Sequence, residues 1–166
     1  MIHIVMVEPE IPSNTGNVAR TAAVTGSKLH LVKPLGFSLD DKYLKRAGLD
    51  YWDKLDIEIH ENFNDYLDKY GLDNTYLSTS KGKNVYSKID YKSINDKNED
   101  IFILFGKETK GLPEEFLKKN IEKTIRIPMK KTLRCLNLSN SVNIVIYEIL
   151  RQLDFLDFEK ISAKLD

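Results

Sequence analysis

The stretch IFILFGKETKGLP, residues 101–113, joins an apolar run to a glycine-containing loop and then to a proline. A short, continuous apolar run is typical of a strand whose two faces are both covered, as in a parallel sheet. Pro113 lies where a helix over EEFLKK would begin. Because ligands of α/β proteins bind on loops at the carboxyl ends of strands, the stretch predicts a buried strand that leads into a binding loop.

Other runs in the chain have the length and composition of strands, and helical patterns separate several of them. Strands are expected at residues 2–8, 29–32, 55–60, 75–80 and 123–129, and helices at 14–26, 62–70 and from about 138 to 153. This alternation predicts an α/β fold, with a mainly parallel sheet and helices on both faces. No repeat or linker divides the chain, so we expect a single domain over residues 1–160 and a short tail over 161–166.

The composition limits the possible classes of protein. With 166 residues, 42% hydrophobic and 30% charged, the chain has the make-up of one folded domain. The formal net charge is +0, so any RNA-binding surface must be a local basic patch. No leader pattern or membrane-spanning apolar run is present, which predicts a cytoplasmic protein. Cys135 is the single cysteine and has no histidine cluster beside it, so neither a disulfide nor a structural metal is expected.

A second stretch, PSNTGNVARTA at residues 12–22, combines small residues with a polar edge. Asn14 suits a helix N-cap, and Asn17 and Arg20 share a helix face because they are three residues apart. Residues with almost no bulk form a stripe at helical spacing: Ala19, Ala22, Ala23 and Gly26. The helix can therefore approach another backbone closely, although a capped helix with one exposed arginine would have the same pattern.

A third stretch, RIPMKKTLRCLNLSNSV at residues 126–142, places a basic loop between a strand end and a helix start. Lys130, Lys131 and Arg134 gather there with no acidic residue among them, and Asn137 and Ser139 are typical of helix N-termini. A short basic run is often only a solvated loop, but this one lies between two polar motifs at expected strand ends. The spacing of glycines matches neither G-x-G-x-x-G nor the P-loop, which disfavours a dinucleotide cofactor.

The last expected helix is apolar on more than one side. One apolar stripe consists of Val142, Val145, Ile149 and Leu153. Further apolar residues widen it: Ile144, Ile146, Tyr147 and Leu150. A helix with two apolar sides needs two partner surfaces. The pattern predicts the sheet on one side and a second subunit on the other, or a central helix within a monomer.

The motifs NTGNVAR, FGKETKGLP and IPM…LNLSNSV occur in the order of the three motifs of the SPOUT, or α/β-knot, superfamily of RNA 2′-O-ribose methyltransferases. With KRAGLDYW at residues 45–52, the resemblance covers nearly the whole chain and is strongest to small, single-domain members that methylate the wobble nucleotide of tRNA. It implies S-adenosylmethionine as donor, a cytidine or modified uridine as acceptor, a homodimer and a deep C-terminal trefoil knot. Periodicity alone would predict an unknotted sheet.

The resemblance also implies a donor pocket, formed by Ser78, Thr79, Gly106, Glu108, Gly111, Ile127, Met129, Cys135 and Leu136. Backbone groups would bind the adenine and ribose, while Ile127, Met129 and Leu136 would supply apolar walls. Cys135 stands where this family commonly has serine. We expect Gly106→Val to fill the pocket while leaving the fold intact.

Arg20 is the residue that the resemblance assigns to the acceptor hydroxyl. Guanidinium groups hold their proton, so we expect Arg20 to stabilise alkoxide charge or bind a neighbouring phosphate rather than act as a base. Geometry would be fixed by Asn14, Asn17, Asn137 and Ser139, and tRNA would be held by Lys130, Lys131, Arg134, Lys81 and Arg46, with Lys83 and Lys45, from two subunits. No role is assigned to the histidines, which lie in expected strands.

Three alternatives remain on sequence grounds. The protein could methylate another tRNA or rRNA site, or it could be a non-catalytic RNA-binding module with the same fold. A nucleotide-dependent oxidoreductase is the third, and the missing glycine fingerprint disfavours it.

Overall fold

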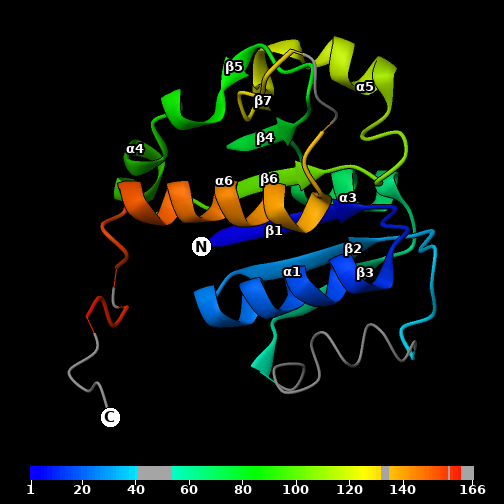
Figure 1. Ribbon diagram of the computed structural model, residues 1–166, viewed down its shortest axis with the longest axis horizontal. Helices are drawn as coiled ribbons and strands as arrows, with labels where there is room; N and C mark the ends of the chain where they lie inside the picture. Colours follow the sequence, from blue (N-terminus) through cyan, green and yellow to red (C-terminus); the bar gives the residue numbers. More distant parts are fainter. Residues whose placement is uncertain (41–53, 132–134, 157, 162–166) are drawn as a thin grey trace.

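A parallel sheet runs through the middle of the molecule, between two layers of helices (Figure 1). The structure is a computed structural model that describes residues 1–40, 54–131, 135–156 and 158–161. Its described strands are β1 Ile2–Val7, β2 Lys28–Val32, β3 Ile57–His60, β4 Thr75–Ser78, β5 Asn84–Val85, β6 Ile101–Phe105 and β7 Thr124–Arg126. They pair in the order β3-β2-β1-β6-β4-β7-β5, and each of these pairings is parallel, as the apolar runs predicted.

Helices cover both faces of the sheet, which confirms the predicted fold class. One face packs against α1 Pro12–Thr25, α4 Tyr91–Asp96 and α6 Leu138–Gln152, and the other against α3 Phe63–Tyr70 and α5 Glu114–Lys119. Alternate residues of β1 serve the two cores, since Ile4 and Met6 face the first layer while Val5 and Val7 face the second. Single turns, η2 Tyr86–Lys88 and η3 Ile121–Lys123, complete the described elements.

The predicted start of the first helix is wrong by about one turn. Ile11 is the N-cap of α1, and no side chain caps the helix there. Asn14 is therefore not the N-cap; it lies inside the first turn and is buried. The other end is as predicted, because Gly26 adopts the left-handed conformation (φ 63°) and its N–H meets the carbonyls of Ala22 and Ala23. In α5, Pro113 is the N-cap rather than the first helical residue.

The last helix buries more of its apolar surface within its own chain than its pattern indicated. Helices α1 and α6 lie side by side on one face of the sheet (Figure 1). Ile146 and Leu150, which widen the apolar stripe, are both buried in the same core as Val142. Tyr147 remains 47% exposed. In the described part of the chain, no helix has the length and hydropathy that crossing a membrane would require.

Candidate functional site

A cavity of about 990 Å³ opens at the carboxyl ends of the strands. Most of its wall comes from residues 7–8 at the end of β1, 78–81 at the end of β4, 105–114 at the end of β6, Ile127 and Met129 after β7, and residues 135–138 at the start of α6. All the residues predicted for the donor pocket line this one cavity: Ser78, Thr79, Gly106, Glu108, Gly111, Ile127, Met129, Cys135 and Leu136. Its volume suits a nucleoside-sized ligand.

The cavity has an apolar side and a polar side. Ile127, Met129 and Leu136 supply apolar surface, and Leu136 is 40% exposed in the described structure. The loops after β4 and β6 also line the cavity. The first of these is fixed to β7, because Thr79 N–H donates to the Ile125 carbonyl at 3.0 Å. A flat apolar ring with polar edges, such as adenine, fits this combination of walls.

Gly106 is required by the loop itself. A Cβ at this position would lie 2.0 Å from the carbonyl carbon of Gly111 and 2.1 Å from the Leu112 nitrogen. The loop folds back here, since Gly111 N–H donates to the Lys107 carbonyl at 2.8 Å and Gly111 has φ +70°. The expectation that Gly106→Val would leave the fold intact is therefore wrong, because the side chain would collide with the protein backbone before it met a ligand.

Glu108 holds the start of α1. Its carboxylate accepts hydrogen bonds from Glu10 N–H at 2.7 Å, Ile11 N–H at 3.2 Å and Asn14 Nδ2 at 3.0 Å. These donors precede or open the helix whose N-cap lacks a side-chain bond of its own. Glu108 lines the cavity as predicted, but its oxygens are engaged with the protein.

A chain of side-chain hydrogen bonds continues from Glu108 to the start of α6. Asn14 Oδ1 accepts from Asn137 Nδ2 at 3.0 Å, and Asn137 Oδ1 accepts from Ser139 N at 2.9 Å and Ser139 Oγ at 2.7 Å. Asn137 is thus the N-cap of α6, as its position predicted. The structure brings these three predicted residues together beside the cavity and assigns their side chains to holding α1 and α6.

The remaining predicted residues lie elsewhere. Asn17 and Arg20 occupy the exposed face of α1 and do not line the cavity of their own chain. Arg20 is six residues beyond Asn14, which is roughly 9 Å along a helix axis. The structure therefore groups Asn14 with Asn137 and Ser139 but leaves Asn17 and Arg20 apart from them.

The predicted RNA-binding lysines are exposed. Lys81 lies on the cavity rim, and Lys130 and Lys131 follow its apolar wall. Within the described ranges, none of the three forms an ion pair with a carboxylate, whereas Lys83 pairs with Glu122. Two further predicted residues, Arg134 and Arg46, lie outside the described residues, as do Lys45 and the KRAGLDYW motif.

The three sequence motifs and the cavity that they line are shared with a known family of proteins. Residues 1–147 match the SpoU rRNA Methylase family. The chain belongs to this family. A tRNA (cytidine(34)-2'-O)-methyltransferase from Yersinia pestis is 47% identical over 161 residues, which span 93% of this SpoU-family chain and 96% of that protein. A relative from Listeria monocytogenes serotype 4b is 52% identical over 153 residues, 92% of this chain and 89% of the relative.

Solved structures agree with the family assignment. One, described as "Structural insights into the 2-OH methylation of C/U34 on tRNA", is 41% identical with a TM-score of 0.84, over 93% of this chain and 97% of that one. The AdoMet-bound rRNA methyltransferase from Sinorhizobium meliloti is 25% identical with a TM-score of 0.78, over 92% of this chain and 56% of its own. The mainly parallel sheet is therefore that of SpoU methyltransferases.

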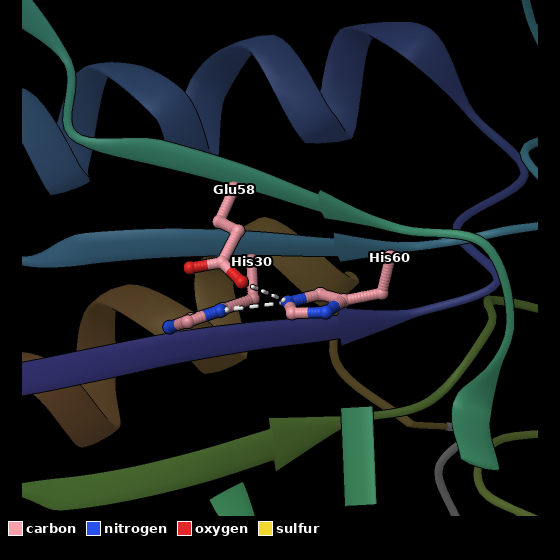
Figure 2. Close-up of side chains that lie close together, drawn as sticks. All are labelled: His30, Glu58 and His60. Carbon is pink, nitrogen blue, oxygen red and sulfur yellow. Dashed lines mark hydrogen bonds and ion pairs between the residues drawn. The ribbon is translucent and has the colours of Figure 1, made fainter. Parts of the chain in front are cut away.

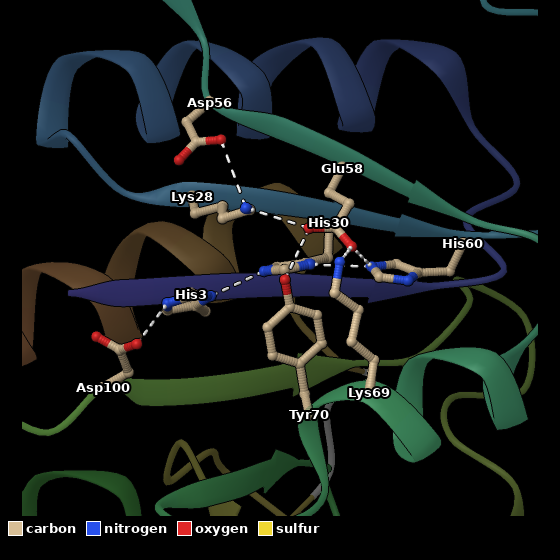
Figure 3. Close-up of polar contacts among 9 residues, drawn as sticks. All are labelled: His3, Lys28, His30, Asp56, Glu58, His60, Lys69, Tyr70 and Asp100. Atoms are coloured by element: carbon tan, nitrogen blue, oxygen red, sulfur yellow. Dashed lines mark hydrogen bonds and ion pairs between the residues drawn. The ribbon is translucent and has the colours of Figure 1, made fainter.

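A separate polar cluster, which the sequence did not reveal, lies on the opposite face of the sheet from α1 and α6. His3, His30 and His60 come from the adjacent strands β1, β2 and β3, and we call them the histidine row (Figure 3). In the sheet register, His3 is opposite Lys28, which is two residues before His30. His30 is in turn opposite Glu58, which is two residues before His60. A step of two keeps all the imidazoles on one face.

The histidine row is continuous. His3 Nδ1 is 2.8 Å from His30 Nε2, and His30 Nδ1 is 3.0 Å from His60 Nε2. At one end of the row, His3 Nε2 faces Asp100 at 3.4 Å, and Glu58 lies 3.7 Å from His60 Nε2, beside the contact between His30 and His60 (Figures 2 and 3). Asp100 beside His3 Nε2 favours a proton on that atom, which leaves His3 Nδ1 to accept from His30 Nε2–H and His30 Nδ1 to accept from His60 Nε2–H.

Burial keeps the histidine row neutral. It lowers the pKa of His3 and His60, and it lowers that of His30 to about 3, with the neighbouring imidazoles adding to the effect. The rings of Tyr66 and Tyr70 from α3 cover the row edge-on. The row is therefore an uncharged polar strip inside an aromatic core.

His30, Glu58 and His60 also have the composition of a metal site, since one ligand atom from each lies within 4.8 Å of the others (Figure 2). Their directions do not suit one. The His30 and His60 rings are tilted by only 21°, and their centroids are 5.3 Å apart while the facing nitrogens are 3.0 Å apart. The two nitrogens thus point at each other, which fits a shared proton rather than a common ion.

Glu58 is moreover already occupied by donors. It accepts from Lys69 Nζ at 2.7 Å and Tyr70 Oη at 2.7 Å, and Lys28 Nζ lies 3.1 Å away (Figure 3). Burial alone would raise the pKa of Glu58, but these hydrogen bonds lower it to about 2. The two ammonium groups beside the carboxylate would repel a divalent metal ion. The residues present therefore fit a hydrogen-bonded strip and not a metal centre.

Proposed function

We propose that this SpoU-family protein transfers a methyl group from S-adenosylmethionine to the ribose 2′-hydroxyl of the wobble nucleotide, position 34, of tRNA. One observation carries the proposal: loops from three distant motifs line a single cavity at the carboxyl end of the sheet. Relatives matched over at least 92% of this chain support the reaction and the substrate, since the Yersinia pestis protein is named for them.

The donor would occupy the cavity between the apolar wall and the backbones of the two opposing loops. Ile127, Met129 and Leu136 would contact the adenine, and the loops at Ser78 and Gly106 would offer backbone hydrogen bonds. Bound there, S-adenosylmethionine supplies a sulfonium methyl group that is already electrophilic. Cys135 fits if its contact with the donor is made through the backbone.

The acceptor requires a group that draws the 2′-hydroxyl into line and compensates the charge left as its proton departs. Arg20 is our candidate, because its fixed positive charge and planar fork suit an alkoxide or the adjoining phosphate. Asn14 and Asn137 would act by holding α1 and α6 to each other. The methyl group passes from sulfur to the 2′ oxygen, and the hydroxyl proton goes to water.

We further propose that the enzyme works as a homodimer through α1 and α6. Asn17, Arg20 and Val24 share one face of α1 by helical spacing, and Val24 is 50% exposed. Tyr147 on the neighbouring α6 is 47% exposed. A second copy on this surface would cover both apolar side chains and bring Arg20 to a site that its own chain does not complete.

The C-terminal trefoil knot belongs to the same proposal. Strand β7 lies between β4 and β5 in the sheet, and α6, which follows β7 in the sequence, packs beside α1 (Figure 1). This arrangement is consistent with threading of the last segment through the loops after β4 and β6.

In the cytoplasm, tRNA would be held by Lys81, Lys130 and Lys131, together with Arg134 and Arg46.

Mapping of ribose methylation in total tRNA, from cells with and without this protein, tests the proposed activity. Loss of the 2′-O-methyl group at position 34 is the expected result. Loss of a 2′-O-methyl group at another tRNA or rRNA position would identify that nucleotide as the substrate instead. S-adenosylmethionine binding by calorimetry without any methylated RNA would instead favour a binding module.

A further inference from the structure

Two loops at the carboxyl edge of the sheet are joined by a set of side-chain contacts outside the motif asparagines. Residues 8–11 follow β1 and lead into α1, while residues 106–111 follow β6 and form part of the cavity wall. Lys107 Nζ donates to Glu8 Oε2 at 2.5 Å. Thr109 donates to the Glu10 carboxylate twice, from its backbone N at 3.0 Å and from Oγ1 at 2.8 Å. We call these two pairs the loop clamp.

The loop clamp holds a backbone that would not adopt its conformation freely. Glu8 has φ +52°, in the left-handed region that non-glycine residues rarely occupy. Its side chain is 30% exposed and paired with Lys107 of the facing loop. Glu10 is placed two residues later, where both of its oxygens reach Thr109. These Thr109 hydrogen bonds lower the pKa of Glu10, so its carboxylate stays charged in the clamp at neutral pH.

The loop clamp connects the parts that the proposed reaction has to align. One loop faces the donor cavity, and the other fixes the direction in which α1 leaves the sheet. Because α1 has no side-chain cap of its own, its position depends on contacts with residues 107–109. Arg20 is carried on this helix, so a shift of its first turn would move the guanidinium relative to the donor cavity that it serves in the proposed dimer.

We infer that Glu10 is a positioning residue for methyl transfer: through Thr109 it holds α1, and hence Arg20, in register with the donor cavity. The inference rests on the proposed function for its kinetic consequence. Glu10 does not line the cavity, and Thr109 is exposed. A displacement of about 1 Å from reactive geometry can cost on the order of 10² in rate. Exposed hydrogen bonds, by contrast, add little to stability.

The kinetic test uses full-length Glu10→Ala, Thr109→Ala and Thr109→Ser variants and the double variant. We expect Glu10→Ala to lower kcat about tenfold while the calorimetric Kd for S-adenosylmethionine stays within about twofold. Thr109→Ser should retain activity because it keeps both donors, and the double variant should be no slower than Glu10→Ala. Glu61→Ala removes a glutamate bonded to Lys33 at the end of β3, and should leave kcat unchanged.

An unchanged kcat in Glu10→Ala, or losses that multiply in the double variant, would overturn the inference. A loss of donor affinity as large as the loss of kcat would also overturn it, because Glu10 would then only maintain the structure of the donor loop.

A second readout needs no RNA. Hydrogen exchange of the amides at residues 10–15 should slow when S-adenosylmethionine binds to the wild-type protein, and this slowing should be lost in Glu10→Ala at saturating donor. Equal protection in both proteins would contradict the inference. If the wild type binds donor and shows the coupling yet methylates no tRNA at position 34, the proposed function fails and the positioning role of Glu10 stands.

Discussion

Asn14 and Asn137 are 123 residues apart in the sequence, and the Nδ2 of Asn137 donates to the Oδ1 of Asn14 at 3.0 Å. Asn14 also donates to Glu108, so the same buried amide connects the loop after β6, α1 and α6. One side chain thus contacts residues from both of the other sequence motifs.

Asn14→Ala should therefore weaken both folding and catalysis. The substitution removes one hydrogen-bond partner from Glu108 and one from Asn137 beside a buried position. We expect this to lower the free energy of unfolding by about 1–3 kcal/mol. Urea unfolding and single-turnover methylation measure the two effects. Asn64→Ala, an exposed asparagine on α3, is the matched control and should change neither. An Asn14→Ala protein with wild-type unfolding would contradict the linking role.

Arg20→Ala should reduce methyl transfer by at least about 10²-fold, the scale for losing a charge-stabilising group. Donor affinity should hardly change, because Arg20 does not line the cavity of its own chain. Arg20→Lys keeps the charge and removes the planar fork, so rescue by lysine would indicate simple electrostatics. Methylation at the wild-type rate by Arg20→Ala would remove the residue from the mechanism.

Gly106→Ala should distort the donor loop, since even one methyl group would lie 2.0 Å from the Gly111 carbonyl carbon. We expect S-adenosylmethionine affinity to fall at least tenfold, on the order of 1.4 kcal/mol, with a lower thermal midpoint. Gly26→Ala separates strain from collision, because its φ is +63° but no atom lies within 4 Å of the added Cβ. It should cost about 1 kcal/mol of stability and leave the Kd unchanged.

The histidine row predicts acid sensitivity. The folded pKa values of His3, His30 and His60 are lowered, so the unfolded chain binds more protons below pH about 6.5. The contribution of the neutral histidines to the free energy of unfolding is fully present above that pH. It is lost as the pH falls toward about 3, the folded pKa of His30. Each histidine steepens the fall by up to about 1.4 kcal/mol per pH unit.

Urea unfolding between pH 7.5 and 5 measures this slope. Tyr70→Phe removes the hydroxyl that donates to Glu58 and leaves the imidazoles in place, so its slope should match that of the wild type. A free energy of unfolding that stays constant from pH 7 to 5 would show that the row accepts protons without penalty.

The proposed dimer predicts a sedimenting species of twice 19.2 kDa at micromolar concentration. Tyr147→Lys should shift it to the monomer, because an ammonium would be buried against the second copy. Val85 on β5 is 38% exposed, and Val85→Lys should leave the dimer intact. A wild-type protein that sediments only as a monomer would contradict the proposal.

Much of the architecture could be predicted from the chain. Continuous apolar runs identified the long central strands, and Gly26 and Asn137 marked helix ends through local backbone chemistry. Strand β5 has only two residues, and α4 has only six with no proline at its start, whereas Pro113 marks the equally short α5, so β5 and α4 were missed.

Long-range contacts explain the errors. Asn14 has the side chain of an N-cap, but Glu108, 97 residues beyond Ile11, accepts from the Ile11 N–H at the start of α1, and the Asn14 amide bonds Glu108 and Asn137 instead. The histidine row depends on the register of three strands, which no local pattern specifies. The loop clamp depends likewise on the folding together of residues separated by 99 positions.

The carboxylate of Glu108 has a consequence for protein engineering. Since it both borders the cavity and anchors the first helix, the segment at 106–111 cannot be transplanted or redesigned as an independent binding loop. A variant made to accept a bulkier methyl-donor analogue would need compensating changes at residues 8–14, selected together with those in the loop. Libraries that randomise the two segments jointly should yield active enzymes that libraries confined to one segment do not contain.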